Sequence, residues 1–205
     1  MRKITIISLV LVAMLSSCGQ KKSAASREQN IEAMQKKEFE KPTDLYENAG
    51  QLVSEVDFTV KANDEQKKDW EDGIIPWISL ENPNPEINNL VGADDVVIKE
   101  NTINILFDYP LNKPVSFEFN NPNGFTRKDL ILLISKKYHE IYDEEEKYAK
   151  TKTIPREKRS GIINRNETDG KYGVWGHDLS DLDLSGIEIH QDSNGKINVI
   201  LLIES

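Results

Sequence analysis

Residues 126–150 read TRKDLILLISKKYHEIYDEEEKYAK. Their apolar side chains recur at steps of three and four residues, the spacing that places them on one face of an α-helix. Thr126 can cap the helix, because Asp129 stands three residues later in the capping-box position. The sequence therefore predicts one long helix whose apolar stripe packs on a sheet. The stripe comprises Leu130, Leu133 or Ile134, Tyr138, Ile141 and Tyr142.

Short runs of β-branched and aromatic residues precede the helix. The runs are Asp95–Lys99, Thr102–Tyr109 and Val115–Phe119. Turn residues separate them, so they predict a meander of three strands. In the second run Ile103, Ile105 and Phe107 alternate with other side chains, which predicts that one face of the strand is buried. An earlier apolar segment, Gly73–Leu80, contains a proline and predicts an extended segment or an edge strand.

Two further runs follow the helix, Asp181–His190 and Lys196–Ile203. The residues between them, Asp192–Gly195, are typical of a hairpin turn. The apolar pattern of the first run changes phase at Ser185-Gly186, which predicts a β-bulge. The predicted fold class is α+β: an antiparallel sheet of about five strands, in the order β-β-β-α-β-β, with one long helix packed on one face. We assign residues 42–205 to this single domain.

The start of the chain predicts a membrane anchor. Residues 1–17 have a basic start, an uncharged apolar stretch and small residues before Cys18, the order of a secretory signal peptide. The segment Leu15-Ser16-Ser17-Cys18 resembles the lipobox of bacterial lipoproteins. That resemblance implies cleavage before Cys18, a diacylglycerol thioether on its sulfur and usually a third acyl chain on the new amino terminus. The alternative is an ordinary cleaved signal followed by a free thiol.

Residues 18–41 predict a flexible tether, because they are polar or charged and contain few apolar side chains. Gly19 follows the cysteine, so the aspartate associated with inner-membrane retention in enteric bacteria is absent. No acidic run of the kind that directs some lipoproteins to the cell surface follows it. By this resemblance we expect the outer membrane, facing the periplasm, rather than the inner membrane or the cell surface.

The charge and amino-acid composition of the chain limit the classes of molecule that it can bind. The net charge is −9, and removal of residues 1–17 would make it more negative, because Arg2 and Lys3 would be lost without any acid. A chain this acidic is unsuited to nucleic acid and is repelled by anionic lipid heads. We therefore expect membrane attachment through lipid on Cys18, a possible protein partner in the envelope and no nucleic acid. Cys18 is the only cysteine, so the domain has no disulfide.

The loop between the helix and the final hairpin is the most distinctive stretch. Residues 164–179 read NRNETDGKYGVWGHDL, which combines three glycines with aromatic and charged side chains. Glycines at this density permit positive φ angles or close backbone contacts. The candidate binding residues of this loop are Arg165, Asp169, Tyr172, Trp175, His177 and Asp178.

Three pieces of the chain resemble a widespread, functionally uncharacterised bacterial family. They are Gly124-Phe125-Thr126-Arg127, the segment Tyr138–Glu146 and the TDGKYGVWGHD run at 168–178. The resemblance extends over residues 75–203. It implies the ββ-helix-ββ order and supplies no activity.

Each candidate residue can be explained by a structural role as well as by a functional one. His177, Asp178, Asp181 and Asp183 could hold a divalent cation with a helix residue such as Glu145. They match no fixed metal motif, and a turn in which Asp178 bonds backbone amides and His177 packs on Trp175 is the simpler interpretation. We therefore assign no metal ligand and no cofactor.

Charged residues elsewhere allow the same choice. His139, Glu140 and the acids of 144–146 could transfer protons, although a solvated helix face explains them. Arg165 could bind an anionic ligand with its planar fork. Alternatively, structural ion pairs could join Arg165 to Asp169, or Arg127 to an acid at 145 or 146.

Three functions follow from these observations. The first is a periplasm-facing binding module with Tyr172 and Trp175 as contacts, and an exposed aromatic patch would support it. The second is a structural envelope protein, supported by a buried pair of Trp175 and His177. The third is a metal-dependent hydrolase, supported by carboxylates that converge on His177 in a cleft. The sequence contains no recognisable catalytic motif, so we assign no catalytic residue.

Overall fold

The computed structural model describes residues 32, 35–37, 46–159 and 164–205. The chain divides into two units, Met1–Lys41 and Pro42–Ser205, and the fold given below is that of the second unit. The predicted signal peptide, Cys18 and most of the predicted tether lie outside the described residues. Of the first unit only residues 32 and 35–37 are described, and they are helical.

Helix α4, Arg127–Tyr148, confirms the predicted long helix. The side chain of Thr126 accepts a hydrogen bond from the Asp129 N–H and the Asp129 side chain accepts one from the Thr126 N–H, so the predicted capping box is present. The buried side chains follow the helical period along one face. They are Leu130, Ile131, Ile134, Ser135, Tyr138, Ile141, Tyr142 and Glu145.

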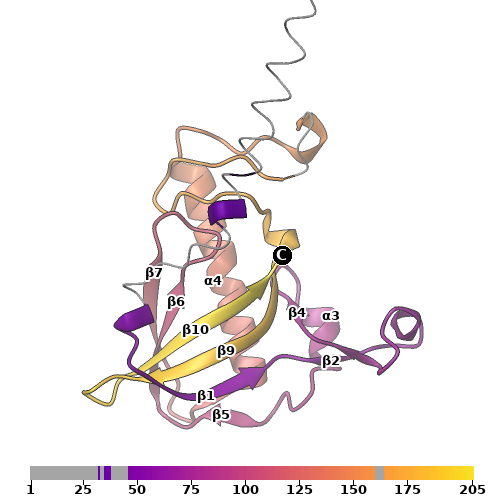
Figure 1. The fold of residues 1–205 in the computed structure, drawn as a ribbon, viewed down its shortest axis with the longest axis vertical. Helices are drawn as coiled ribbons and strands as arrows, with labels where there is room; N and C mark the ends of the chain where they lie inside the picture. Colours follow the sequence, from indigo (N-terminus) through magenta and orange to yellow (C-terminus); the bar gives the residue numbers. More distant parts are fainter. Residues whose placement is uncertain (1–31, 33–34, 38–45, 160–163) are drawn as a thin grey trace, which may run out of the picture. The chain divides into compact units, whose positions relative to one another are not determined.

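Helix α4 covers one face of a sheet and lies behind it in Figure 1. The strand order is β1-β9-β10-β6-β7, and β4 pairs with β9 beside the end of β1. The strands are β1 (Gln51–Asp57), β4 (Ile78–Ser79), β6 (Thr102–Phe107), β7 (Val115–Asn120), β9 (Asp183–Gln191) and β10 (Ile197–Glu204). Ile103, Ile105 and Phe107 of β6 are fully buried, as their alternation predicted.

The α+β class and the single long helix on one face are confirmed, but the sheet is mixed rather than wholly antiparallel. Strand β10 runs parallel to β6, while every other pair in the sheet is antiparallel. The apolar pattern identifies strands but not their neighbours. The strongly apolar β10 takes the central position between β9 and β6, and it runs in the same direction as β6.

The first strand of the predicted meander lies outside the sheet. Val96–Ile98 forms β5, which pairs with β8 (Phe125–Thr126) at the start of α4. Strand β1 takes an edge of the sheet instead, and the sequence did not predict it. Only Val56 of its seven residues is buried, so β1 has no alternating pattern to recognise.

The final hairpin confirms two local predictions. Residues 192–196 connect β9 to β10 and include the predicted turn, and the Asp192 side chain accepts hydrogen bonds from the backbone N–H groups of Asn194 and Lys196. The register of the two strands shifts where Gly186 faces Leu202 and Leu184 faces Ile203. Ser185 is therefore the extra residue of the predicted bulge.

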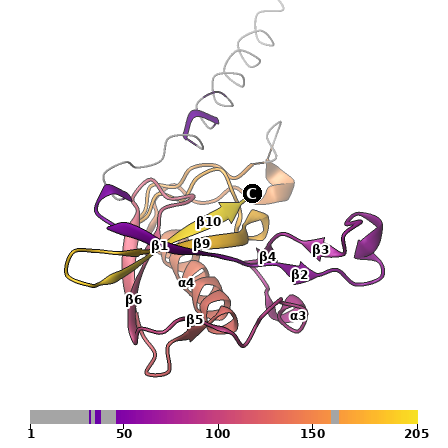
Figure 2. The ribbon, with the colours of Figure 1, turned by 60° about the horizontal axis from the view of Figure 1, so that its bottom comes forward.

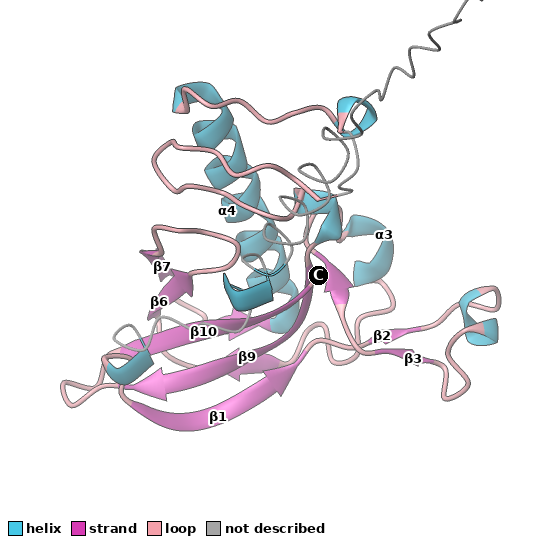
Figure 3. Ribbon diagram, turned by 45° about the horizontal axis from the view of Figure 1, so that its top comes forward, coloured by secondary structure: helices cyan, strands magenta, loops and turns pink. Residues whose placement is uncertain are grey.

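A small hairpin arm extends from the sheet (Figures 2 and 3). It contains β2 (Val60–Lys61), the short helix η1 (Gln66–Lys68) and β3 (Ile74–Ile75). Trp70 and Trp77 pack edge to face in it, with ring centroids 5.2 Å apart. Strands β3 and β4 lie within Gly73–Leu80, which confirms the predicted extended segment, and α3 (Asn84–Ile87) follows.

Candidate functional site

The distinctive loop closes around a carboxylate at the end of α4. The Glu145 side chain is fully buried. Its Oε1 accepts hydrogen bonds from Thr168 Oγ1 at 2.7 Å and from the Gly170 N–H at 2.8 Å. Its Oε2 accepts a hydrogen bond from the Tyr172 N–H at 2.8 Å. We call the loop 164–178 together with Glu145 the clasp.

The clasp keeps Glu145 ionised. Burial raises the pKa of Glu145. Hydrogen bonds from the Tyr172 N–H, the Thr168 hydroxyl and the Gly170 N–H lower it by more than burial raises it, so the pKa lies below its ordinary value. A carboxylate that accepts several such bonds is stabilised in its charged form. The sequence placed Glu145 among possible metal ligands. The structure instead makes it the group around which the loop folds.

Glycine at position 170 is required by this packing. A Cβ atom built there would lie 2.6 Å from Glu145 Oε2 and 2.7 Å from Cδ. Asp169, beside it, accepts hydrogen bonds from the N–H groups of Lys150 at 2.9 Å and Thr151 at 2.7 Å. Those bonds lower the pKa of Asp169. The predicted binding residue Asp169 thus holds the chain that leaves α4.

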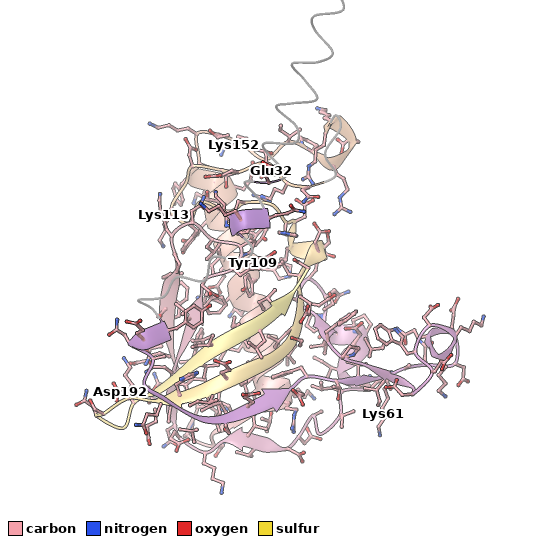
Figure 4. The ribbon with its side chains drawn as sticks, in the orientation of Figure 1. Glu32, Lys61, Tyr109, Lys113, Lys152 and Asp192 are labelled. Carbon is pink, nitrogen blue, oxygen red and sulfur yellow. The ribbon has the colours of Figure 1, made fainter. Side chains whose placement is uncertain are left out.

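The clasp also joins the β6–β7 connection. Backbone hydrogen bonds run from Asn112 N to Gly173 O, from Lys113 N to Tyr172 O and from Trp175 N to Pro110 O. Lys113 Nζ additionally donates to Gly170 O at 2.8 Å. Lys113 and Lys152 lie at the same end of the domain (Figure 4), where Lys152 Nζ donates to Lys147 O. The loop therefore links the end of α4 to the sheet.

The aromatic residues of the loop are buried. The exposed fraction is 3% for Tyr172, 5% for Trp175 and 8% for His177. The ring of His177 lies 6.1 Å from that of Trp175, and both pack near Tyr109. His177 therefore packs on Trp175, as the simpler interpretation predicted. The patch of exposed aromatic side chains that would support binding through this loop is not formed.

Asp178 faces arginines rather than a metal. Arg159 binds it with two hydrogen bonds, Nη1 to Oδ2 at 2.6 Å and Nη2 to Oδ1 at 2.8 Å. Arg165 Nη1 lies 3.8 Å from Asp178 Oδ1, and Arg156 Nη2 lies 3.4 Å from Oδ2. The hydrogen bonds from Arg159 outweigh burial and lower the pKa of Asp178. Residues 46–159 and 164–205 contain no group of three or more His, Cys, Asp or Glu side chains that could hold a metal ion.

Arg165 has other partners than the sequence predicted. Its guanidinium stacks on the ring of Tyr142 at 5.0 Å, and Nη2 lies 4.0 Å from Glu146 Oε2. Asp169 is not its partner, because its carboxylate bonds the backbone after α4. Arg127 pairs with Asp95 at 3.2 Å, not with Glu145 or Glu146. The acids that pair with Arg127 and Arg165 are brought to them by the fold, so the predicted partners were wrong.

A second feature lies on the outer side of α4. A cleft of about 470 Å³ separates the middle of α4 from the end of β7. Its apolar lining comprises Phe119, Phe125, Leu132 and Leu133, and its polar lining comprises Asn120, Asn121, Asp129, Lys136, Lys137 and Glu140. We call this feature the cleft.

The sequence contains a signal for the cleft in the first turns of α4. Residues 130–134 are five consecutive apolar residues, which is more than one helix face can bury. Leu132 is the surplus residue, and it is 37% exposed.

Comparisons with known proteins leave the function open. The sequence matches no protein-family model and no curated protein, and the fold matches no solved structure. The family resemblance of the loop thus stays a prediction. No helix among the described residues has the length and apolar character needed to span a membrane.

Proposed function

We propose that this protein is a lipid-anchored lipoprotein of the bacterial envelope, facing the periplasm from the outer membrane, which binds another envelope protein. The segment 1–17 and Cys18 support the anchor, since their order is that of a lipoprotein signal. Two or three acyl chains on one residue anchor a protein durably. The binding surface in this proposal is the cleft.

One observation carries the binding role: an apolar, open cleft beside a strand at the edge of the sheet. Leu132 is exposed on its wall, and Phe119 and Leu133 are only partly buried. Apolar side chains gathered in a hollow and rimmed by polar groups are typical of interaction sites. A partner that fills the cleft gains the burial of these side chains.

The loop 164–178 is not the contact surface in this proposal. Tyr172 and Trp175 are buried, so a partner would have to open the clasp to reach them. Opening would strip Glu145 of its donors, which costs about 1–3 kcal/mol for each buried group left unsatisfied. We therefore move the binding site from the loop to the cleft.

A mainly structural role in the envelope is the second candidate. The burial of Trp175 with His177 favours it, because a loop that serves only to close the fold has no need of exposed side chains. A metal-dependent hydrolase draws no support from the described residues, since the carboxylate next to His177 is bound by Arg159.

The test uses the full-length chain expressed in a bacterium with an outer membrane. Labelled palmitate should enter the wild type and not Cys18→Ser, and the label should fractionate with the outer membrane. A photo-reactive benzoylphenylalanine in place of Leu132 should cross-link to one protein of the envelope. The same residue in place of exposed Tyr148, outside the cleft, is the control. Label in Cys18→Ser contradicts the anchor, and equal cross-linking from both positions contradicts binding at the cleft.

A further inference from the structure

Strand β7 lies beside the cleft and has one edge that no other described strand pairs with. It pairs with β6 alone among the described strands, so one of its sides faces away from the sheet. In Figure 1 it forms the margin of the sheet. The backbone N–H and C=O groups on such an edge are available to another strand.

The pleat of β7 directs the side chains of an added strand. Phe117 and Phe119 face the α4 side, where Lys137 Nζ lies 4.5 Å from the ring centroid of Phe117. Side chains on a paired strand alternate between the same two faces and lie beside their cross-strand neighbours. Every second side chain of a strand added to β7 would therefore lie beside these phenylalanines and reach the cleft.

The charges around the cleft select the partner. Asp129 is bound in the capping box with Thr126, and Lys137 pairs with Glu140. Lys136 is exposed and takes part in no hydrogen bond or ion pair with any described residue. Lys136 is therefore the charged side chain of the lining that has no partner among the described residues, and it offers a positive charge to a carboxylate of a bound partner.

We propose that the partner contributes an extended segment that adds to β7 as a new strand, with apolar side chains in the cleft and a carboxylate on Lys136. The inference rests on the proposed function and names the chemistry of the partner. Backbone hydrogen bonds to the edge supply general affinity in this mode, and alternate side chains supply selectivity. Leu132 and Leu133 receive the apolar side chains.

The probe is a library of random eight-residue peptides displayed on phage, selected against the full-length protein in detergent. Selected peptides should alternate apolar residues and carry at least one Asp or Glu. As synthetic peptides they should bind Lys136→Glu at least tenfold more weakly than wild type. Lys61→Glu is the matched control (Figure 4): it makes the same charge change at an exposed residue of β2, away from the cleft, and should bind within twofold of wild type.

Amide hydrogen exchange separates strand addition from other modes. A bound peptide should slow exchange of the outward N–H groups of β7 at least tenfold and leave β1, the opposite edge, unchanged. A library that yields no binder, binders without a preference for acids, equal binding to Lys136→Glu, or unchanged exchange in β7 would each overturn the inference. So would pairing of two copies of this chain through β7, measured by sedimentation.

Failure here is distinguishable from failure of the proposed function. Leu132 cross-links in the envelope combined with unchanged exchange in β7 mean that the protein binds a partner by another geometry. Absence of both cross-links and peptide binding removes the binding role itself.

Discussion

Two regions of helix α4 differ in the burial and hydrogen bonding of their side chains. At its end, the fully buried Glu145 accepts three hydrogen bonds of 2.7–2.8 Å from the loop. Nine residues earlier, or about 14 Å along the axis, Lys136 projects beside the exposed Leu132 and has no partner among the described residues. One region is closed around a carboxylate whose two oxygens accept hydrogen bonds, while the other is open to solvent.

The contrast teaches that the most distinctive sequence need not be the binding surface. The clasp is rich in glycine, aromatic and charged residues because it must surround a carboxylate at close range. The cleft consists of ordinary residues and is noticeable only in three dimensions. Substitutions in the clasp should therefore act on stability, and substitutions in the cleft should leave stability unchanged.

Removal of the Glu145 carboxylate should have the largest effect. Glu145→Ala removes the acceptor of the Gly170 and Tyr172 N–H groups and leaves the Thr168 hydroxyl with Val174 O alone, so the free energy of unfolding should fall by about 3–5 kcal/mol. Urea unfolding of the full-length chain in mild detergent measures it. Asp143→Asn, on an exposed residue of the same helix, is the control and should change it by less than about 0.5 kcal/mol. An equal effect of the two substitutions would argue against the clasp.

Gly170→Ala should come next. The added methyl group meets the Glu145 carboxylate at 2.6 Å, which should cost about 2–3 kcal/mol in free energy of unfolding. Gly73→Ala is a useful comparison, because Gly73 has a φ of +72° and no atom within 4 Å of the added carbon. The loss there should be only the backbone strain, about 1 kcal/mol. If Gly73→Ala is the more damaging change, close contact is not why residue 170 is glycine.

His177→Ala should lower the free energy of unfolding by about 2 kcal/mol, because it leaves a void beside Trp175 and Tyr109. The midpoint of thermal unfolding, measured with chelator and with added divalent cations, checks this. Added cations should leave the midpoint unchanged in both the wild type and His177→Ala. Stabilisation of the wild type alone by a cation would restore the metal-site interpretation.

Lowering the pH should reduce the free energy of unfolding by less than these substitutions do. The folded-state pKa values of Glu145 and Asp178 are lowered, so their contribution is complete above the pKa values of the unfolded side chains, about 4.3 and 3.9. The contribution is lost as the pH falls below those values through the folded-state pKa values. Urea unfolding between pH 7 and pH 3 should show a steeper loss for wild type than for Glu145→Gln. Parallel curves would mean that Glu145 does not titrate differently in the two states.

Leu132→Ser should have the smallest effect on stability, within about 0.5 kcal/mol, because the side chain is exposed. The same substitution should abolish binding of the selected peptides. Thermal unfolding and peptide titration on one preparation measure both. A large loss of stability would mean that Leu132 belongs to the core and that the cleft is a structural feature rather than a binding surface.

Local patterns predicted the elements well and their neighbours poorly. The helix, its capping box and the final bulge follow from spacing within a few residues. The parallel pairing of β6 with β10 depends on which apolar strand takes the centre, and no local pattern specifies that. Strand β1 escaped because its only buried residue is Val56.

The candidate site was predicted in part. The sequence singled out the loop as a candidate binding site, and the burial of Trp175 and His177 favours the structural interpretation among those that the sequence left open. The role of Glu145 was predictable in principle, since it continues the buried period of Tyr138, Ile141 and Tyr142. The arginines at 156 and 159 were not, because only the fold brings them to Asp178.

The position of β10 bears on when the domain can form. It is the last strand along the chain, yet it lies at the centre of the sheet between β9 and β6. The sheet therefore cannot form until β10 has been synthesised, because β9 and β6 both pair with it. Under the proposed export of the chain by residues 1–17, this topology would delay folding of the domain until export is under way.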